Sequence, residues 1–420
     1  MAALSSSDLA QVLKTIYPKG VPLDEVPRKC PTMALLEKNS EWAGAGTLFP
    51  LVWGAPQGAS SNIVRAITNK SPSKNSGFLV TTVDDYAVWG LTGRVISQTR
   101  NDMGSFTRFL KTELDGAMNA LKLHSFNTLF RNGGGAIGRI TSTSNTATAT
   151  VVLQNRFDSM YFSPGQVILS SATDGTSGSV RAGVSDGTVV GQTILSVDSS
   201  TGTLVGTRNW DDAITGCAAS DYLFRDGDFG VCMPGFEAWL PASAPGATSF
   251  FGVDRSVETT KLGGVRLPST SANKPIDETL IDLLDEVSYN GGTPDVIVLH
   301  NRQWTNLEKR LASKIMYGDR TADSAVAKLG LRSIVINSPN GPVDVISDSN
   351  ALIDTALALQ LNTWEMGSMG EQYRMLDDDG LPYLRTALAD EVEGRLVSRP
   401  GLACKAPGFN GRCALSINGL

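Results

Sequence analysis

The two histidines are the first candidates for catalytic groups in this chain. His300 follows the apolar run Val296–Leu299, which is typical of a buried strand. Active-site groups often stand at the ends of such strands in α/β folds, so an α/β hydrolase that uses His300 as its base is one hypothesis. The sequence offers no evident serine or cysteine partner for His300, which weighs against this hypothesis. His124 falls inside a helical pattern and is expected to be a structural or surface residue.

Two glycine motifs match the spelling of catalytic or phosphate-binding loops. Gly183-Val-Ser-Asp-Gly187 matches the nucleophile elbow, which needs a buried strand before it and a helix after it. Its neighbours here are rich in Thr, Gly and Ser, so a turn is favoured. The run from Gly133 to Gly138 follows a predicted helix and lacks the Lys-Ser/Thr ending of a phosphate-binding loop. We interpret it as a helix terminator.

Metal and redox chemistry have little support in the sequence. The run Asp377–Gly380 lacks the remaining ligands of a calcium loop and reads as a solvated turn. The five cysteines show no two-residue metal-ligand spacing, so reduced thiols are expected, with a Cys404–Cys413 disulfide as an open alternative. They are Cys30, Cys217, Cys232, Cys404 and Cys413. We therefore predict no cofactor, no metal and no enzymatic activity.

Charge is unevenly distributed along the 420 residues. The chain carries a net charge of -6, but residues 1–135 have 14 basic and 10 acidic groups. Residues 136–228 have 5 basic and 9 acidic groups and no lysine. A protein with nucleic acid on one side and water on the other would show such a division, and chance variation is the alternative. The sequence has no signal peptide and no apolar run of about 20 residues, so no membrane partner is expected.

The N-terminal third has an extended character. The first 45 residues begin with a short predicted helix at Ser5–Tyr17 and form an arm with too few apolar groups to fold alone. Thr47–Trp53 and Gly77–Val83 alternate as strands around a polar, basic tip at Asn69–Gly77, and Tyr86–Trp89 is expected to continue the returning strand. A two-stranded hairpin is marginal by itself in water, so a partner surface should hold it. Lys70, Lys74 and Asn75 are the residues predicted at its tip.

One long amphipathic helix follows. From Ser105 to Phe130, apolar residues repeat at intervals of three and four. Arg108, Lys111 and Lys122 fall off this stripe, which predicts a basic flank. The glycines after Asn132 should end the helix.

The remaining chain divides into two patterns. Short Thr-, Val- and Ile-rich runs between Gly135 and Asp228 predict a compact β barrel or sandwich inserted as its own unit. From Pro275 onward, helices and buried-type strands alternate as an α/β domain, in which Ala351–Leu361 fits either a helix or a strand. Glu391–Arg399 is expected to be a late strand.

This order of parts resembles the major capsid proteins of tailed bacteriophages. The stretches that carry the resemblance are Val95–Ala117, Asp221–Asp228, Gly235–Pro241 and Pro294–Arg302. The resemblance implies an α+β fold with a long spine helix, an extended β-hairpin loop and an inserted all-β subdomain.

The resemblance also implies a division of the chain. An N-terminal arm (1–45), an extended loop (46–100) and a spine helix (101–134) would come first. The inserted β domain (135–228), placed on the outer side of a shell or between its rings, would precede a peripheral continuation (229–274), an axial domain (275–366) and a C-terminal return (367–420).

By this resemblance, the chain would assemble with itself into pentamers and hexamers of an icosahedral head. The head would enclose double-stranded DNA without sequence specificity, with Arg108, Lys111 and Lys122 facing the interior. Scaffolding and portal proteins would be partners, a decoration protein is a further one, and assembly would take place in the bacterial cytoplasm. Because the sequence starts at Met1 with a short arm, we expect a separate scaffolding protein instead of proteolytic removal of an N-terminal segment. The shell of a bacterial encapsulin-type nanocompartment is the alternative, with enzyme cargo in place of DNA.

Overall fold

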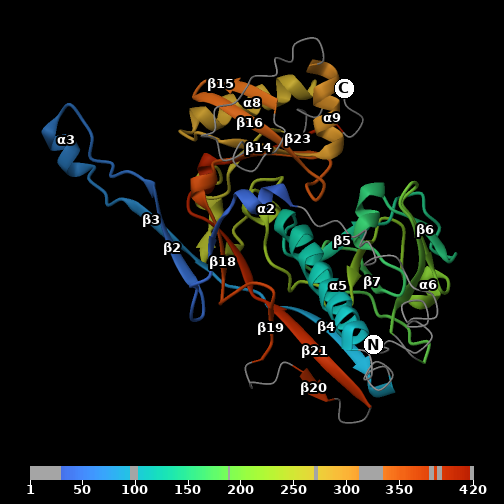
Figure 1. The fold of residues 1–420 in the computed structure, drawn as a ribbon. Helices are drawn as coiled ribbons and strands as arrows, with labels where there is room; N and C mark the ends of the chain where they lie inside the picture. Colours follow the sequence, from blue (N-terminus) through green and yellow to red (C-terminus); the bar gives the residue numbers. More distant parts are fainter. Residues whose placement is uncertain are drawn as a thin grey trace.

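The computed structural model describes residues 30–94, 103–187, 190–268, 273–311, 334–377, 383–385 and 390–416, with side chains from residue 113 onward in the long helix. The predicted helix at Ser5–Tyr17 and the passage Val95–Arg100 lie outside the described residues. A long helix runs through the middle of the molecule (Figure 1). A β barrel lies beside it, an α/β domain lies beyond one end, and a two-stranded hairpin reaches away from the body.

The long helix α5 (Met103–Phe130) confirms the predicted spine and begins two residues earlier than expected. Its last turns are buried on nearly every side, because Phe126, Leu129 and Phe130 enter the main core while Leu123 enters the barrel core. Gly133 and Gly135, at φ values of 87° and 88°, supply the left-handed backbone that ends it.

The main core is built around large aromatic side chains. Phe236 of α7 (Phe236–Trp239) lies 4.8 Å from Trp364, and Phe78 lies 5.0 Å from Trp239, measured between ring centroids. The buried indole N–H of Trp239 donates to the Leu402 carbonyl at 3.0 Å, which removes the penalty of burying a polar group. Helix α2 (Pro31–Leu35) and a sheet of order β1–β18–β22 border this core. These strands span Glu37–Asn39, Trp364–Ser368 and Pro400–Cys404.

The hairpin consists of β2 (Thr47–Gly54) and β3 (Lys74–Val80), paired antiparallel from Thr47↔Val80 to Gly54↔Lys74. The expectation that Tyr86–Trp89 continues this hairpin is wrong. That segment belongs to β4 (Asp85–Thr92), which pairs over its full length with β21 (Glu391–Ser398), about 300 residues later. Helix α5 packs on this sheet, whose other strands β19 (Arg374–Met375) and β20 (Tyr383–Arg385) lie along the far edge of β21.

The inserted block is a closed barrel. Its strands follow the order β5–β10–β7–β8–β9–β6. They span Ala136–Arg139, Tyr222–Arg225, Val167–Ser171, Gln192–Asp198, Thr203–Gly206 and Thr150–Val152. The two ends of the order meet, since Ile140 bridges Leu153 and the Gln154 N–H donates to the Arg139 carbonyl at 2.8 Å. Closure leaves no long free edge. The short helices η1 (Arg156–Tyr161) and α6 (Trp210–Ala213) complete the unit.

The α/β domain contains a six-stranded sheet of order β13–β23–β17–β14–β16–β15. The strands span Val265–Arg266, Gly411–Ala414, Thr355–Leu359, Val296–His300, Gly341–Asp348 and Ile334–Ser338. The segment left open between helix and strand thus forms strand β17. Helices α8 (Ile276–Tyr289) and α9 (Asn301–Leu311) pack against this sheet. The predicted range 275–366 misses β13 and β23, which belong to this sheet, and includes the start of β18, which does not.

Both faces of the central strand β14 are buried. In β14, Ile297 and Leu299 pack with α8 and α9, while Val296 and Val298 belong to the main core. This explains why the sequence of β14 is continuously apolar. Small elements fill the remaining connections: β11 (Ser249–Phe250), β12 (Val253–Asp254), η2 (Arg255–Val257), η4 (Leu361–Thr363) and η5 (Pro407–Phe409). Among the described residues, no helix has the length and apolar character needed to cross a bilayer.

Candidate assembly surface

The base of the hairpin is anchored in the body. Phe78 and Val80 are completely buried on one face of β3, and Phe49 of β2 lies 5.6 Å from Trp42. The Leu79 N–H donates to the Phe251 carbonyl at 3.0 Å, and the Lys261 Nζ donates to the Trp53 carbonyl at 3.0 Å. These contacts fix the direction in which the hairpin leaves the body.

The face of the hairpin that points away from the core exposes apolar side chains. Leu48 and Val52 of β2 are 61% and 66% exposed, on the face opposite to the buried one. Strands with one apolar face buried usually place polar groups on the other. Exposed aliphatic residues along a projecting ribbon are instead typical of an interaction surface.

The hairpin tip contains a short helix that the sequence did not reveal. Helix α3 (Ile63–Thr68) is capped by Asn62, whose Oδ1 accepts from the Val64 N–H at 2.9 Å and the Arg65 N–H at 3.3 Å. Its three large aliphatic side chains are exposed: Ile63, Val64 and Ile67 are 72%, 66% and 59% exposed. We define the tip patch as Ile63, Val64 and Ile67.

The three residues predicted for the tip are exposed, but two of them lie elsewhere. Lys70 lies just after α3, within the tip. Lys74 and Asn75 are the first residues of β3, paired with Gly54 and Val52. The turn is longer than predicted, because α3 and its flanking residues occupy it.

The predicted basic flank can be followed at one of its three positions. The side chains of Arg108 and Lys111 lie outside the described ones, although both residues belong to α5. Lys122 is half-buried, with its Nζ 5.8 Å from the centroid of the Tyr373 ring. Lys122 therefore faces the C-terminal part of the chain in a cation–π contact instead of an open flank.

The catalytic candidates are not arranged for catalysis with one another. His300 is buried, its ring lies 4.9 Å from that of Phe157, and its Nδ1 accepts from the Arg302 N–H at 3.1 Å. Burial lowers the pKa of His300 to about 4, so the ring is neutral near pH 7. Ser185 lies in the barrel, where its Oγ accepts from the Gly187 N–H at 3.1 Å. Neither bond joins a nucleophile to a base.

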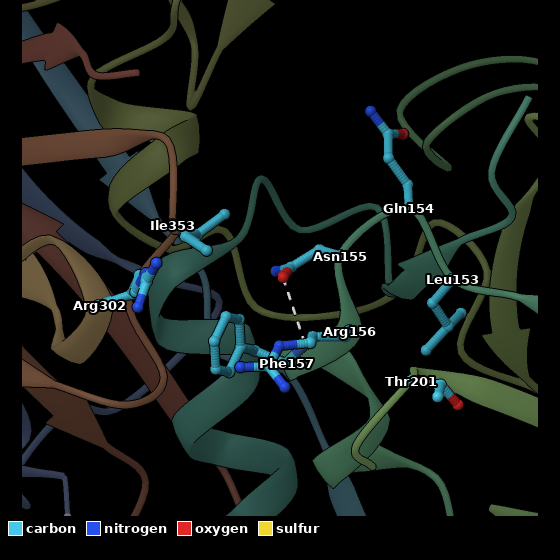
Figure 2. Close-up of a pocket in the computed structure, with 8 residues that line it drawn as sticks. All are labelled: Leu153, Gln154, Asn155, Arg156, Phe157, Thr201, Arg302 and Ile353. Atoms are coloured by element: carbon cyan, nitrogen blue, oxygen red, sulfur yellow. Dashed lines mark hydrogen bonds between the residues drawn. The ribbon is translucent and has the colours of Figure 1, made fainter. Parts of the chain in front are cut away.

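A cavity of about 350 Å³ marks the junction between barrel and α/β domain (Figure 2). Arg302 and Ile353 approach it from the α/β side, and η1 with its preceding loop approaches from the barrel. The Arg156 guanidinium is already engaged, since it lies 4.6 Å from the Phe157 ring centroid and donates to the Ser200 carbonyl at 3.0 Å. Nearby, the Tyr161 hydroxyl donates to Asn350 at 3.3 Å. We interpret this region as a packing junction that orients the barrel.

Sequence reasoning missed a buried polar cluster around His124. The imidazole meets Asp85 of β4, Arg225 of β10, and Asp228 and Cys232 of the following loop. Arg225, Asp228 and Cys232 lie within eight residues of one another, but Asp85 and His124 are about 100 or more residues away. Only the fold brings these three segments together.

Comparison with known proteins identifies the fold. No protein-family model matches the chain, and no curated protein matches it. A chain of the cyanophage A-1(L) capsid asymmetric unit is similar over 98% of both chains, at 12% identity and a TM-score of 0.50. A chain from Mycobacterium phage Ogopogo (10% identity, TM-score 0.45, covering 99% and 100%) and one from the capsid of a native GTA particle (9%, 0.42, covering 99% and 100%) are also similar. The likeness to the cyanophage capsid chain confirms the predicted tailed-phage capsid fold.

Proposed function

We propose that this chain is the major capsid protein of a tailed bacteriophage, which assembles with itself into the icosahedral head and encloses double-stranded DNA. The fold, shared with a cyanophage capsid chain, supports this proposal. The observation that carries it is the hairpin, which is anchored at its base and exposes apolar groups along one face and at its tip.

The exposed groups fit contact with a second copy of the chain. Burying an isoleucine or valine side chain contributes about 1.5–3 kcal/mol. Two isoleucines of the tip patch buried on a neighbour would contribute about 3–6 kcal/mol per contact. A difference of 1.4 kcal/mol changes an equilibrium constant tenfold, so this range corresponds to at least about 100-fold in association. Repeated around a ring, such a contact favours assembly.

The finer assignments follow from the same proposal. Scaffolding and portal proteins would guide assembly, and a decoration protein would bind the finished shell. The barrel would lie on the outer side or between rings, since it has net negative charge and no lysine. The finished protein would reside in the virion after assembly in the bacterial cytoplasm.

Electron microscopy of the purified chain and its variants tests the proposal. The unaltered chain should form closed shells or rings. The double variant Ile63→Asp/Ile67→Asp should raise the concentration needed for assembly at least about 100-fold, because charged groups cannot be buried unpaired.

Leu195→Asp provides the matched control. Leu195 is 62% exposed on the barrel, comparable to Ile67, and should tolerate the charge without loss of assembly. If the unaltered chain at high concentration forms compact monomers and no rings or shells, the proposal is overturned. Nuclease-protected DNA in particles from infected cells would support the phage assignment, whereas enzyme cargo without DNA would favour a nanocompartment.

A further inference from the structure

The polar cluster around His124 joins three parts of the molecule. His124 comes from α5, Asp85 from the sheet under that helix, and Asp228 and Cys232 from the loop that leaves the barrel. The His124 Nε2 lies 3.4 Å from Asp85 Oδ1, and its Nδ1 lies 3.7 Å from Asp228 Oδ2. One donor atom each from His124, Asp228 and Cys232 lie within 4.8 Å of one another.

The loop is held closely against the end of the spine helix. A Cβ built on Gly135 would come within 2.1 Å of the Asp228 carbonyl oxygen and 3.2 Å of the Cys232 Sγ. Gly135 therefore permits an approach that no other residue would allow. The positions of Asp228 and Cys232 are set by backbone packing.

The cluster is short of positive charge. Asp85 and Asp228 contribute two carboxylates to the cluster, and Arg225 contributes one guanidinium. His124 and Asp85 are 8% and 6% exposed. Within the described part of the chain, the buried atoms Asp85 Oδ2 and Asp228 Oδ2 have no hydrogen-bond partner. Leaving such a buried charge uncompensated is costly.

The hydrogen bonds assign a tautomer to His124. Arg225 Nη1 lies 3.2 Å from the His124 Nδ1, and a guanidinium can only donate. The Nδ1 must therefore carry the lone pair, while the Nε2 carries the proton and faces Asp85. A metal-binding histidine usually donates its second ring N–H to a carboxylate, which orients the ring and strengthens the ligand. The cluster already has this arrangement.

We infer that His124, Asp228 and Cys232 form a binding site for a borderline divalent cation such as Zn²⁺, with Asp85 orienting the imidazole. Nitrogen, oxygen and sulfur donors together suit Zn²⁺ and Co²⁺ rather than Mg²⁺ or Ca²⁺. Binding displaces the thiol proton of Cys232 to solvent, so that the two positive charges of the ion offset the thiolate and the surplus carboxylate charge. Asp228 is 23% exposed and provides access from solvent. The bound ion ties the barrel to the spine helix.

Arg225 is the competitor of the ion. Its Nη1 donates to the same Nδ1 lone pair that the ion requires, so it must move aside when the ion binds. The positive charge of its guanidinium also repels a cation bound at this position. The substitution Arg225→Gln removes this charge and should therefore raise metal affinity. A purely structural role for Arg225 would predict only a loss of stability.

Titration of the full chain with Co²⁺ tests the site. One equivalent should produce the near-ultraviolet charge-transfer absorption of a cysteine–cobalt bond, and Zn²⁺ should displace it and raise the Tm. His124→Gln should abolish the absorption, because glutamine keeps an amide donor toward Asp85 but lacks the Nδ1 lone pair. Cys232→Ser should also abolish it, while Arg225→Gln should lower the Kd at least about tenfold, the change expected for about 1.4 kcal/mol.

Cys217 is the internal control. It is 5% exposed, similar to Cys232 at 6%, and lies in the barrel core. In the unaltered chain, Zn²⁺ should slow alkylation of Cys232, measured by mass spectrometry, and leave Cys217 unchanged. This readout needs no variant, so poor folding of a variant does not affect it. Absence of the absorption at millimolar Co²⁺, its survival in Cys232→Ser, or equal effects on both cysteines would overturn the inference.

Discussion

His300 shows how burial sets the chemical state of a single residue. The ring is only 4% exposed and lies against Phe157, which disfavours the charged form. Its pKa is lowered to about 4 in the folded chain, compared with about 6.5 for an unperturbed histidine. In the sequence, the buried-type strand before His300 makes it a candidate catalytic residue. In the structure, its burial makes it a neutral packing group.

This shift predicts a pH dependence of stability. Between about pH 6.5 and 4 the unfolded chain binds a proton at His300 and the folded chain does not, so the free energy of unfolding falls as the pH is lowered through this window. The slope approaches about 1.4 kcal/mol per pH unit, for a total of about 3 kcal/mol. Above this pH window, the contribution of His300 to the slope should vanish. Denaturant unfolding of the chain at pH 7, 6 and 5 measures the effect.

His300→Asn is the appropriate comparison, because its amide oxygen can still accept from the Arg302 N–H. Other groups titrate in the same window, so the difference in unfolding free energy between the two proteins isolates His300. Parallel pH profiles for both proteins would contradict the shift.

At the level of elements, the local sequence pattern predicted single helices and strands but not how they pair. The three- and four-residue repeat in α5, the alternation in β2 and the apolar run of β14 were all readable, since each reflects the environment of one element. The pairing of β4 with β21 was not, because it joins segments about 300 residues apart and neither segment specifies its partner. Helix α3 escaped for another reason: its apolar residues face solvent, so no amphipathic pattern marks it.

The candidate sites divide in the same way. The hairpin could be predicted as an assembly element from its length and composition, but its tip patch could not. The cluster around His124 depends on four separate elements whose meeting is a property of the fold. Residues that do not follow a motif spacing give no sequence signal for a cluster of this kind.

The barrel is an element that should fold by itself. It has its own core, and its first and last strands, β5 and β10, are neighbours. Trp210 is completely buried there and is the sole tryptophan of residues 135–228. We predict that a fragment of residues 135–228 unfolds cooperatively, with tryptophan emission that shifts to the red in denaturant. Emission typical of exposed tryptophan without denaturant would contradict this prediction.

Asp158→Asn distinguishes the fragment from the full chain. In the full chain, Asp158 pairs with Arg131 of the body at 2.9 Å in a partly buried position. Breaking a fully buried pair costs about 3–5 kcal/mol, which is the upper bound for this substitution. The fragment lacks Arg131, so there the substitution should cost much less or stabilise.

At the scale of the whole molecule, charge is separated along the chain. The segment up to residue 135 has an excess of basic groups and the barrel has an excess of acidic groups. The barrel and α5 lie side by side (Figure 1). In a shell that encloses DNA, such a molecule would orient its basic segment inward.

The last prediction concerns retention of DNA by the proposed shell. Arg108→Glu together with Lys111→Glu should lower the nuclease-protected DNA per particle. The decrease should be larger at low salt, because each phosphate contact releases counterions and contributes about 0.9 to the slope of log affinity against log salt concentration. Single changes to alanine should be tolerated, since many weak contacts share the load around the shell. Lys122 is left unchanged because its ammonium already lies over Tyr373. The charge-preserving exchange Arg108→Lys/Lys111→Arg is the control for helix packing. If the reversed and exchanged particles hold the same DNA at every salt concentration, this end of α5 does not face the genome.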